Sequence, residues 1–189
     1  FNGGSQLAMG TIADVNAVAQ IIANTNIAAC AGALTTLIAT QLIYKRVDLT
    51  MVLNGALAGL VSITAGPDYP TMELAMAIGM IGGLLVLVAV PMFDKFKIDD
   101  PVGALSVHLV NGIWGTLAVG IFNPDVALFA QIKGIVVIGA FTFFSSLVVW
   151  AVLKYSVGIR VLEEEEYNGM DVCEFGLHAY PEFVERQGA

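Results

Sequence analysis

The chain has 189 residues, of which 57% are hydrophobic and only 13% are charged, and its mean hydropathy is +0.80. Soluble domains carry about 25% charged residues, and a soluble fold of this length could not bury so much apolar surface. The net charge of −8, without any basic run, argues against nucleic-acid binding. The composition therefore predicts an all-α membrane protein that lies in a lipid bilayer.

Five apolar stretches are long enough, or nearly so, to cross about 30 Å of hydrocarbon as helices of about 20 residues. They are expected at residues 17–43, 51–65, 74–93, 102–122 and 129–155, and the second is the shortest. Turn and cap residues separate them. We therefore expect a polytopic helical bundle with five transmembrane helices over residues 17–157. Residues 1–16 precede it as the end of an earlier helix and an outer loop, and residues 158–189 follow it as a tail.

Basic residues occur only after every second apolar stretch, with Lys133 as the one exception. Lys45 and Arg46 come after the first stretch, Lys95 and Lys97 after the third, and Lys154 and Arg160 at the end of the fifth. By the positive-inside rule these ends face the cytoplasm, so residues 1–16 lie outside and the tail lies in the cytoplasm. An odd number of spans with the N-terminus outside predicts that an N-terminal half precedes Phe1.

His108 is the single ionisable side chain of the fourth stretch. An ionisable group inside a bilayer is costly and marks a functional site by default, and histidine can take up or release a proton near neutral pH. This predicts a path along which a proton or a protonatable solute moves. The alternative is a structural histidine that hydrogen-bonds between helices, which is the role we expect for the nearby Asn111.

For the other polar or small residues inside the apolar stretches we expect structural roles before functional ones. Asn24, Thr25 and Asn26 are expected to form hydrogen bonds between helices, with a polar pathway as the alternative. Gly55 with Gly59 and Gly79 with Gly83 form G-x-x-x-G patterns, which predict close helix packing. The sequence has no nucleotide-binding loop and no metal-ligand set, so neither an enzyme, a cofactor nor a metal is expected.

Several runs together resemble the ammonium transporter family (Amt/Mep/Rh), specifically its C-terminal half. They are Phe1-Asn2-Gly3-Gly4-Ser5, Ala23-Asn24-Thr25, Asn54-Gly55-Ala56-Leu57-Ala58-Gly59-Leu60-Val61, Asp99-Asp100-Pro101, Val107-His108, Gly112-Ile113-Trp114-Gly115-Thr116, Gly120-Ile121-Phe122, Gly158-Ile159-Arg160-Val161 and Gly169-Met170-Asp171-Val172. Their order and spacing agree along nearly the whole chain.

The resemblance implies an eleven-helix transporter made of two inverted five-helix halves and a last long helix, assembled as a homotrimer with one pore per subunit. This chain would supply the stretch from the end of the sixth span through the eleventh, without the N-terminal half. The implied function is transport of ammonium or ammonia across the cell membrane for nitrogen uptake. The alternative is an ammonium sensor with the same fold and a signalling tail.

The resemblance also implies roles for three residues. His108 matches the second histidine of the pore pair, Phe1 matches one phenylalanine of the outer gate, and Ser5 matches the serine of the outer recruitment site. A cytoplasmic regulatory protein of the PII type is the implied partner of the tail. The chain departs from the family where Leu109 replaces a glycine and where Phe175 replaces a histidine before Gly176.

Overall fold

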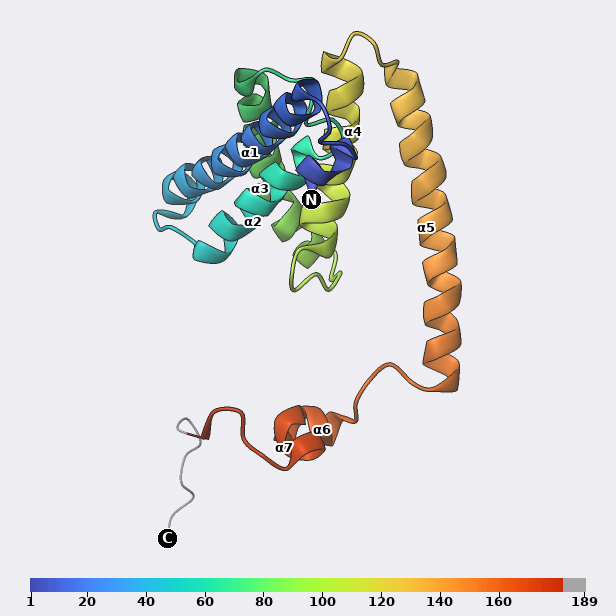
Figure 1. Cartoon of the computed structure of the whole chain (residues 1–189). Helices are drawn as coiled ribbons and strands as arrows, with labels where there is room; N and C mark the ends of the chain where they lie inside the picture. The colour runs from blue at the N-terminus through green and yellow to red at the C-terminus, as the bar shows by residue number, and fades with distance from the viewer. Residues whose placement is uncertain (182–189) are drawn as a thin grey trace. The chain divides into compact units, whose positions relative to one another are not determined.

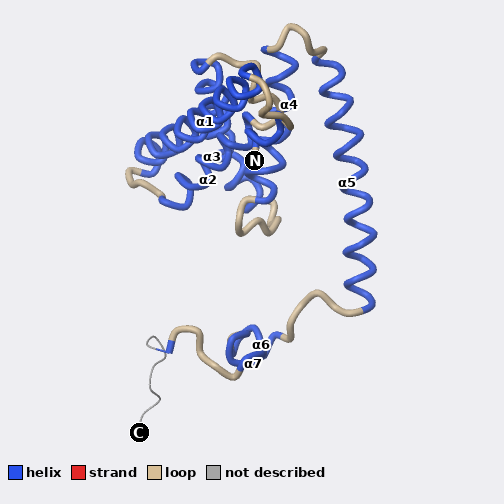
Figure 2. The backbone as a smooth tube through the Cα atoms, in the orientation of Figure 1, coloured by secondary structure: helices blue, strands red, loops and turns tan. Residues whose placement is uncertain are grey.

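The computed structural model describes residues 1–181, which are helical without any strand (Figures 1 and 2). The elements in chain order are η1 (Asn2–Gln6), α1 (Ile12–Tyr44), α2 (Leu49–Ile63), α3 (Met72–Lys95), η2 (Ala104–Leu109), α4 (Val110–Phe122), α5 (Leu128–Ser156), α6 (Glu163–Asn168) and α7 (Met170–Phe175). The chain divides into two compact units, Phe1–Gly139 and Ala140–Ala189, and α5 begins in the first and ends in the second. The last part of the predicted tail, residues 182–189, lies outside the described residues.

The five predicted apolar stretches all form helices, which confirms the polytopic helical bundle. Four helical segments are long and apolar enough to cross a membrane, namely α1, α3, η2 continued by α4, and α5. The remaining helix, α2, is shorter. Its 15 residues give a length of about 22 Å at 1.5 Å per residue.

The first helix begins earlier than the hydrophobic pattern indicates, at Ile12 instead of residue 17. A capping box sets this start: the Asp14 N–H donates to Thr11 Oγ1 at 3.1 Å, and the Thr11 N–H donates to Asp14 Oδ2 at 3.1 Å. These bonds satisfy backbone N–H groups that a helix start leaves without partners. The polar first turn is therefore helical although its hydropathy does not indicate it.

Glycines bring α1, α2 and α3 into close contact. A Cβ on Gly59 of α2 or on Gly79 of α3 would collide with the backbone carbonyl of Ala28 in α1. A Cβ on Gly55 would collide with Thr36, and one on Gly83 would lie 2.7 Å from the Gly32 carbonyl oxygen. Both predicted G-x-x-x-G patterns are thus confirmed as packing surfaces, and both pack on α1.

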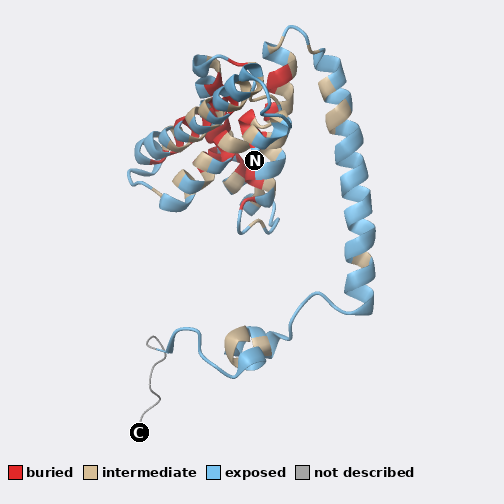
Figure 3. Cartoon of the chain, in the orientation of Figure 1, coloured by how far each residue is buried: buried red, intermediate tan, exposed pale blue. Residues whose placement is uncertain are grey.

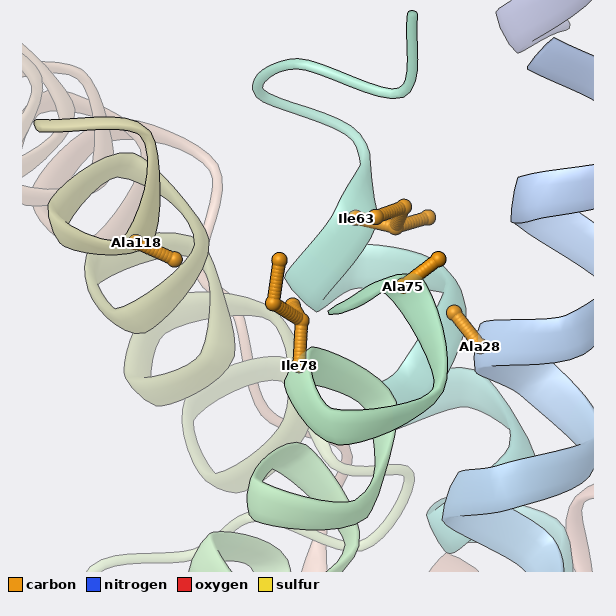
Figure 4. Packing of buried hydrophobic residues seen from close by; sticks show 5 residues of the cluster. All are labelled: Ala28, Ile63, Ala75, Ile78 and Ala118. Carbon is orange, nitrogen blue, oxygen red and sulfur yellow. The ribbon is translucent and has the colours of Figure 1, made fainter. Parts of the chain in front are cut away.

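Buried residues gather where α1 to α4 meet (Figure 3), and alanine is frequent among the apolar ones. One buried cluster contains Ala28, Ile63, Ala75, Ile78 and Ala118 (Figure 4). Trp114 packs against this cluster, and its indole N–H donates to the Ile78 carbonyl at 3.1 Å. The indole thus joins α4 to α3 while satisfying its own donor.

The described part of the tail, residues 158–181, forms two short helices, α6 and α7. The Ala179 N–H donates to Asp171 Oδ2 at 2.7 Å, which brings the end of the described chain back onto α7. This hydrogen bond is the main reason that the pKa of Asp171 lies below its usual value. Residues 158–181 are thus largely exposed but locally folded.

Candidate functional site

A cavity of about 470 Å³ opens in the first unit, between the N-terminus, α2 and the segment formed by η2 and α4. Its lining residues are Phe1, Leu57, Leu60, Val61, Thr64, Ala65, His108, Gly112 and Thr116. The wall is apolar apart from one imidazole and two hydroxyl groups. Two residues singled out in the sequence, Phe1 and His108, therefore line the same cavity although they lie 107 positions apart.

Asn2 holds Phe1 at the rim of this cavity. The Asn2 side chain is 5% exposed, and its Nδ2 lies 3.1 Å from Thr25 Oγ1 of α1 and 3.4 Å from Thr64 Oγ1 at the end of α2. Phe1 itself is largely exposed and also lines a second cavity of about 300 Å³. Sequence reasoning gave Asn2 no role of its own, because both hydroxyl partners are distant in sequence.

A π-helical turn presents His108 to the cavity. In η2 the His108 N–H donates to the Gly103 carbonyl at 3.2 Å, five residues back. Such turns are rare, widen the helix locally and often occur at functional sites. Gly103, with φ at +77°, permits the tight entry into this turn. His108 is exposed at the cavity in this chain, while its neighbour Val107 is fully buried.

The Asp100 carboxylate fixes the start of this turn. Oδ1 accepts the Leu105 N–H at 3.0 Å, and Oδ2 accepts the Ser106 N–H at 2.8 Å and the Ser106 hydroxyl at 2.7 Å. The helix begins only at Ala104, and the left-handed Gly103 is its N-cap residue. Asp100 therefore reaches the N–H groups of the first turn from three residues before the cap, and Pro101 lies outside the helix.

The same hydrogen bonds keep Asp100 ionised. Partial burial alone would raise its pKa, but the donors on Ser106 and Leu105 outweigh burial and hold the pKa below the usual value. A group with a lowered folded-state pKa stabilises the fold above its unfolded pKa and loses that contribution as the pH falls through the folded value. The stability that Asp100 gives to the His108 turn is therefore present at neutral pH and is lost only in acid.

Replacing Asp100 by asparagine should lower the stability of the complete protein. The amide has one acceptor oxygen where the carboxylate has two, so at least one donor of the turn loses its charge-assisted bond, at a cost of about 1–3 kcal/mol. Thermal unfolding in detergent would measure this as a lower midpoint. The matched control is Asp99→Asn, because Asp99 is exposed and holds none of these donors. Equal midpoints for the two variants would contradict this role of Asp100.

Of the polar residues expected to bond between helices, Asn26 accepts the Cys30 thiol within α1 and lines the 300 Å³ cavity instead. Asn24 is fully buried, and its Nδ2 donates to the Pro67 and Pro70 carbonyls at 3.0 and 2.9 Å, which ties α1 to the loop after α2. Asn111 is also fully buried, and its Oδ1 lies 3.3 Å from Ser62 Oγ of α2. The interhelical role predicted for Asn111 is confirmed, whereas Asn24 bonds to the loop between α2 and α3 and not to another helix. Neither residue lines the 470 Å³ cavity.

Ser5 lies apart from the other two predicted site residues. It is an exposed residue of η1 and lines neither cavity. Within residues 1–181, histidine, cysteine and carboxylate side chains form no group of three that could hold a metal ion. The chemistry that the cavity offers is therefore that of an apolar passage with a titratable imidazole and hydroxyl oxygens. A bare cation is strongly disfavoured on apolar walls, whereas a small neutral molecule is not.

Comparisons with known proteins give a consistent result. The sequence model of the Ammonium Transporter Family matches residues 1–180. A relative from Synechocystis sp. is 39% identical over 180 residues, with 93% of this chain and 41% of the relative covered. Ammonium transporter Amt2 of Archaeoglobus fulgidus is 35% identical over 204 residues, with 97% and 43% covered. The chain thus spans less than half the length of these relatives.

Solved structures agree with the sequence comparisons. A structure titled Sensor Amt Protein superposes with a TM-score of 0.83 at 34% identity, covering 92% of this chain and 44% of the other. The crystal structure of Saccharomyces cerevisiae Mep2 gives a TM-score of 0.74 at 24% identity, covering 86% and 40%. The second likeness concerns the fold alone.

Proposed function

This chain belongs to the Ammonium Transporter Family, and we propose that it supplies one side of a path by which ammonium or ammonia crosses a membrane. Its apolar helices and its relatives make it part of an integral membrane protein. The observation that supports the path is the cavity that Phe1 and His108 line together.

The chemistry of the cavity suggests how such a path would discriminate. Ammonium and K⁺ are similar in size and carry the same charge, so an apolar passage disfavours both ions. Ammonium can leave its proton behind and continue as ammonia, whereas K⁺ has no proton to lose. In its neutral form the His108 imidazole has one donor and one acceptor, so it can accept an N–H from ammonia or relay a proton. We propose His108 as the pore residue on this basis.

Phe1 is proposed as part of a gate at the outer end of the path. Phe1 lines the cavity and is largely exposed, and the buried Asn2 side chain ties the next residue to α1 and α2. Ser5 is proposed as part of an outer recruitment site, where a hydroxyl and aromatic faces would hold a cation before it enters. The aromatic partners of Phe1 and Ser5 would come from the N-terminal half of the transporter, as would a second pore histidine.

The assembly that we propose follows from the family. Its members are transporters, not enzymes, and we propose that the complete protein is a homotrimer in the cell membrane. Basic residues after α1, α3 and α5 favour a cytoplasmic tail. A regulatory protein of the PII type remains the proposed partner of that tail, although the usual histidine is replaced by Phe175.

A sensor function is the second candidate, and one observation supports it. The structure titled Sensor Amt Protein is 34% identical to this chain and covers 92% of it. An ammonium sensor would use the same cavity for binding and pass a signal through the tail, without sustained flux.

Transport by the complete protein in proteoliposomes tests the proposed function. An internal pH dye and a potassium-sensitive dye would follow imposed gradients of ammonium chloride and potassium chloride. The proposal expects flux that depends on the protein for ammonium and none for K⁺. Ammonium binding by folded protein without any flux would favour the sensor, and the absence of both binding and flux would contradict each candidate.

A further inference from the structure

Three residues of one helical strip line the cavity at successive turns. His108, Gly112 and Thr116 are spaced four residues apart, so they lie on one face of the segment formed by η2 and α4. At 1.5 Å per residue the strip is about 12 Å long. It therefore extends from the imidazole toward the end of α4 at Phe122, along the cavity that Phe1 also lines.

Gly112 leaves the middle of this strip open. A Cβ built on Gly112 would meet no atom within 4 Å, whereas one on Gly115, on another face of α4, would collide with the Ser62 carbonyl. Helix packing within the described chain thus explains the absence of a side chain at Gly115 but not at Gly112. The open step at Gly112 gives a small molecule unobstructed contact with the strip between His108 and Thr116.

The Thr116 hydroxyl presents an acceptor to this open space. Its single proton is donated to the Gly112 carbonyl at 2.8 Å, so the oxygen keeps only acceptor capacity. Thr116 is half-buried and lines the cavity, and no side chain or backbone group of residues 1–181 donates to its Oγ1. Thr64, the other hydroxyl of the wall, differs because it lies within 3.4 Å of the Asn2 amide nitrogen.

We propose that Thr116 Oγ1 is a second substrate-binding position in the path, which accepts an N–H of ammonia or ammonium about 12 Å along the helix from His108. Because the hydroxyl already donates its proton to a backbone carbonyl, its oxygen can only accept, which favours a solute that carries several N–H donors. The inference rests on the proposed function, because the path defines the substrate. It adds to that function a residue that binds the substrate through a hydroxyl oxygen and not through a titrating group.

Substitutions at Thr116 in the complete protein test the inference. Thr116→Val keeps the shape and removes the oxygen, Thr116→Ala removes the oxygen with less bulk, and Thr116→Ser restores it. The matched control is Thr40→Val. Thr40 is a fully buried threonine of α1, and its Oγ1 donates to the Thr36 carbonyl, four residues back, at 2.8 Å. Thr40 lines neither cavity.

Ammonium flux in proteoliposomes, measured over a range of concentrations, is the readout. We expect valine and alanine at residue 116 to raise the half-saturating ammonium concentration by about three- to tenfold, the effect of one neutral hydrogen bond. Thr116→Ser and Thr40→Val should leave the half-saturating ammonium concentration near the parent value. The inference would be overturned if both the valine and the alanine variant had the half-saturating concentration of the parent. It would also be overturned if the serine variant were as impaired as those two. In either case, ammonium flux through the parent would still uphold the proposed function. A folded but silent parent would overturn the proposed function and the inference together.

Discussion

Replacing His108 by alanine should reduce selective ammonium flux through the complete protein by about 100-fold, the lower end of the range for a positioned proton-transfer group. His108 is the one titratable side chain that lines the 470 Å³ cavity. Without it, the cavity wall keeps hydroxyl oxygens and apolar carbon but has no group that accepts and releases a proton near neutral pH. Flux of ammonium and K⁺ into proteoliposomes would be compared between the parent and the variant.

The control for this variant is Leu109→Ala, one residue further along the same turn. Leu109 is 47% exposed and lies outside the cavity. We expect this variant to transport as the parent does, since truncating an exposed side chain changes neither the cavity nor the core. Unchanged ammonium flux with unchanged exclusion of K⁺ in His108→Ala would show that the imidazole is not part of the path.

The second large effect is expected at Gly59, where leucine should prevent the chain from folding. The first added carbon would already collide with the Ala28 carbonyl, and it would lie 3.0 Å from the Ala29 Cα. These are backbone atoms of α1, so the clash cannot be relieved by a change of side-chain rotamer, and α1 and α2 would have to separate. We expect a loss of about 3 kcal/mol or more in the free energy of unfolding.

Yield and monodispersity on size-exclusion chromatography, followed by thermal unfolding, would measure this effect. Gly134→Leu in α5 is the control, because a Cβ there meets no atom of the described chain within 4 Å. The packing interpretation would be contradicted by a Gly59→Leu protein that folds with the midpoint of the parent.

Hydropathy and glycine spacing predicted most of the architecture, because both are local properties of the sequence. The apolar stretches become helices, and Gly59 and Gly79 lie at helix contacts as the G-x-x-x-G patterns indicate. The ends of the helices were predicted less well. The polar first turn of α1 depends on the Thr11 and Asp14 capping box, and the late start at Ala104 depends on Gly103 with positive φ.

The candidate site was only partly accessible from the sequence. His108 stands out because it is ionisable in an apolar stretch, and Phe1 was singled out through a family resemblance. Their common cavity depends on tertiary contacts, above all those of Asn2 with Thr25 and Thr64. The open step at Gly112 is also a tertiary feature, since no local residue pattern distinguishes Gly112 from the packing glycine at Gly115.

A substituted cysteine at Gly112 would test most directly whether this cavity is the transport path. The complete protein would carry serine in place of its cysteines, including Cys30 and Cys173, and a small neutral thiol reagent would be applied during ammonium flux. The control is Ile113→Cys, because Ile113 is 37% exposed, is the next residue of α4 and lies outside the cavity. If the cavity is the path, modification at residue 112 blocks flux, ammonium slows that modification, and the reagent leaves flux through the residue 113 variant unchanged. Full flux after complete modification at residue 112 would contradict the account.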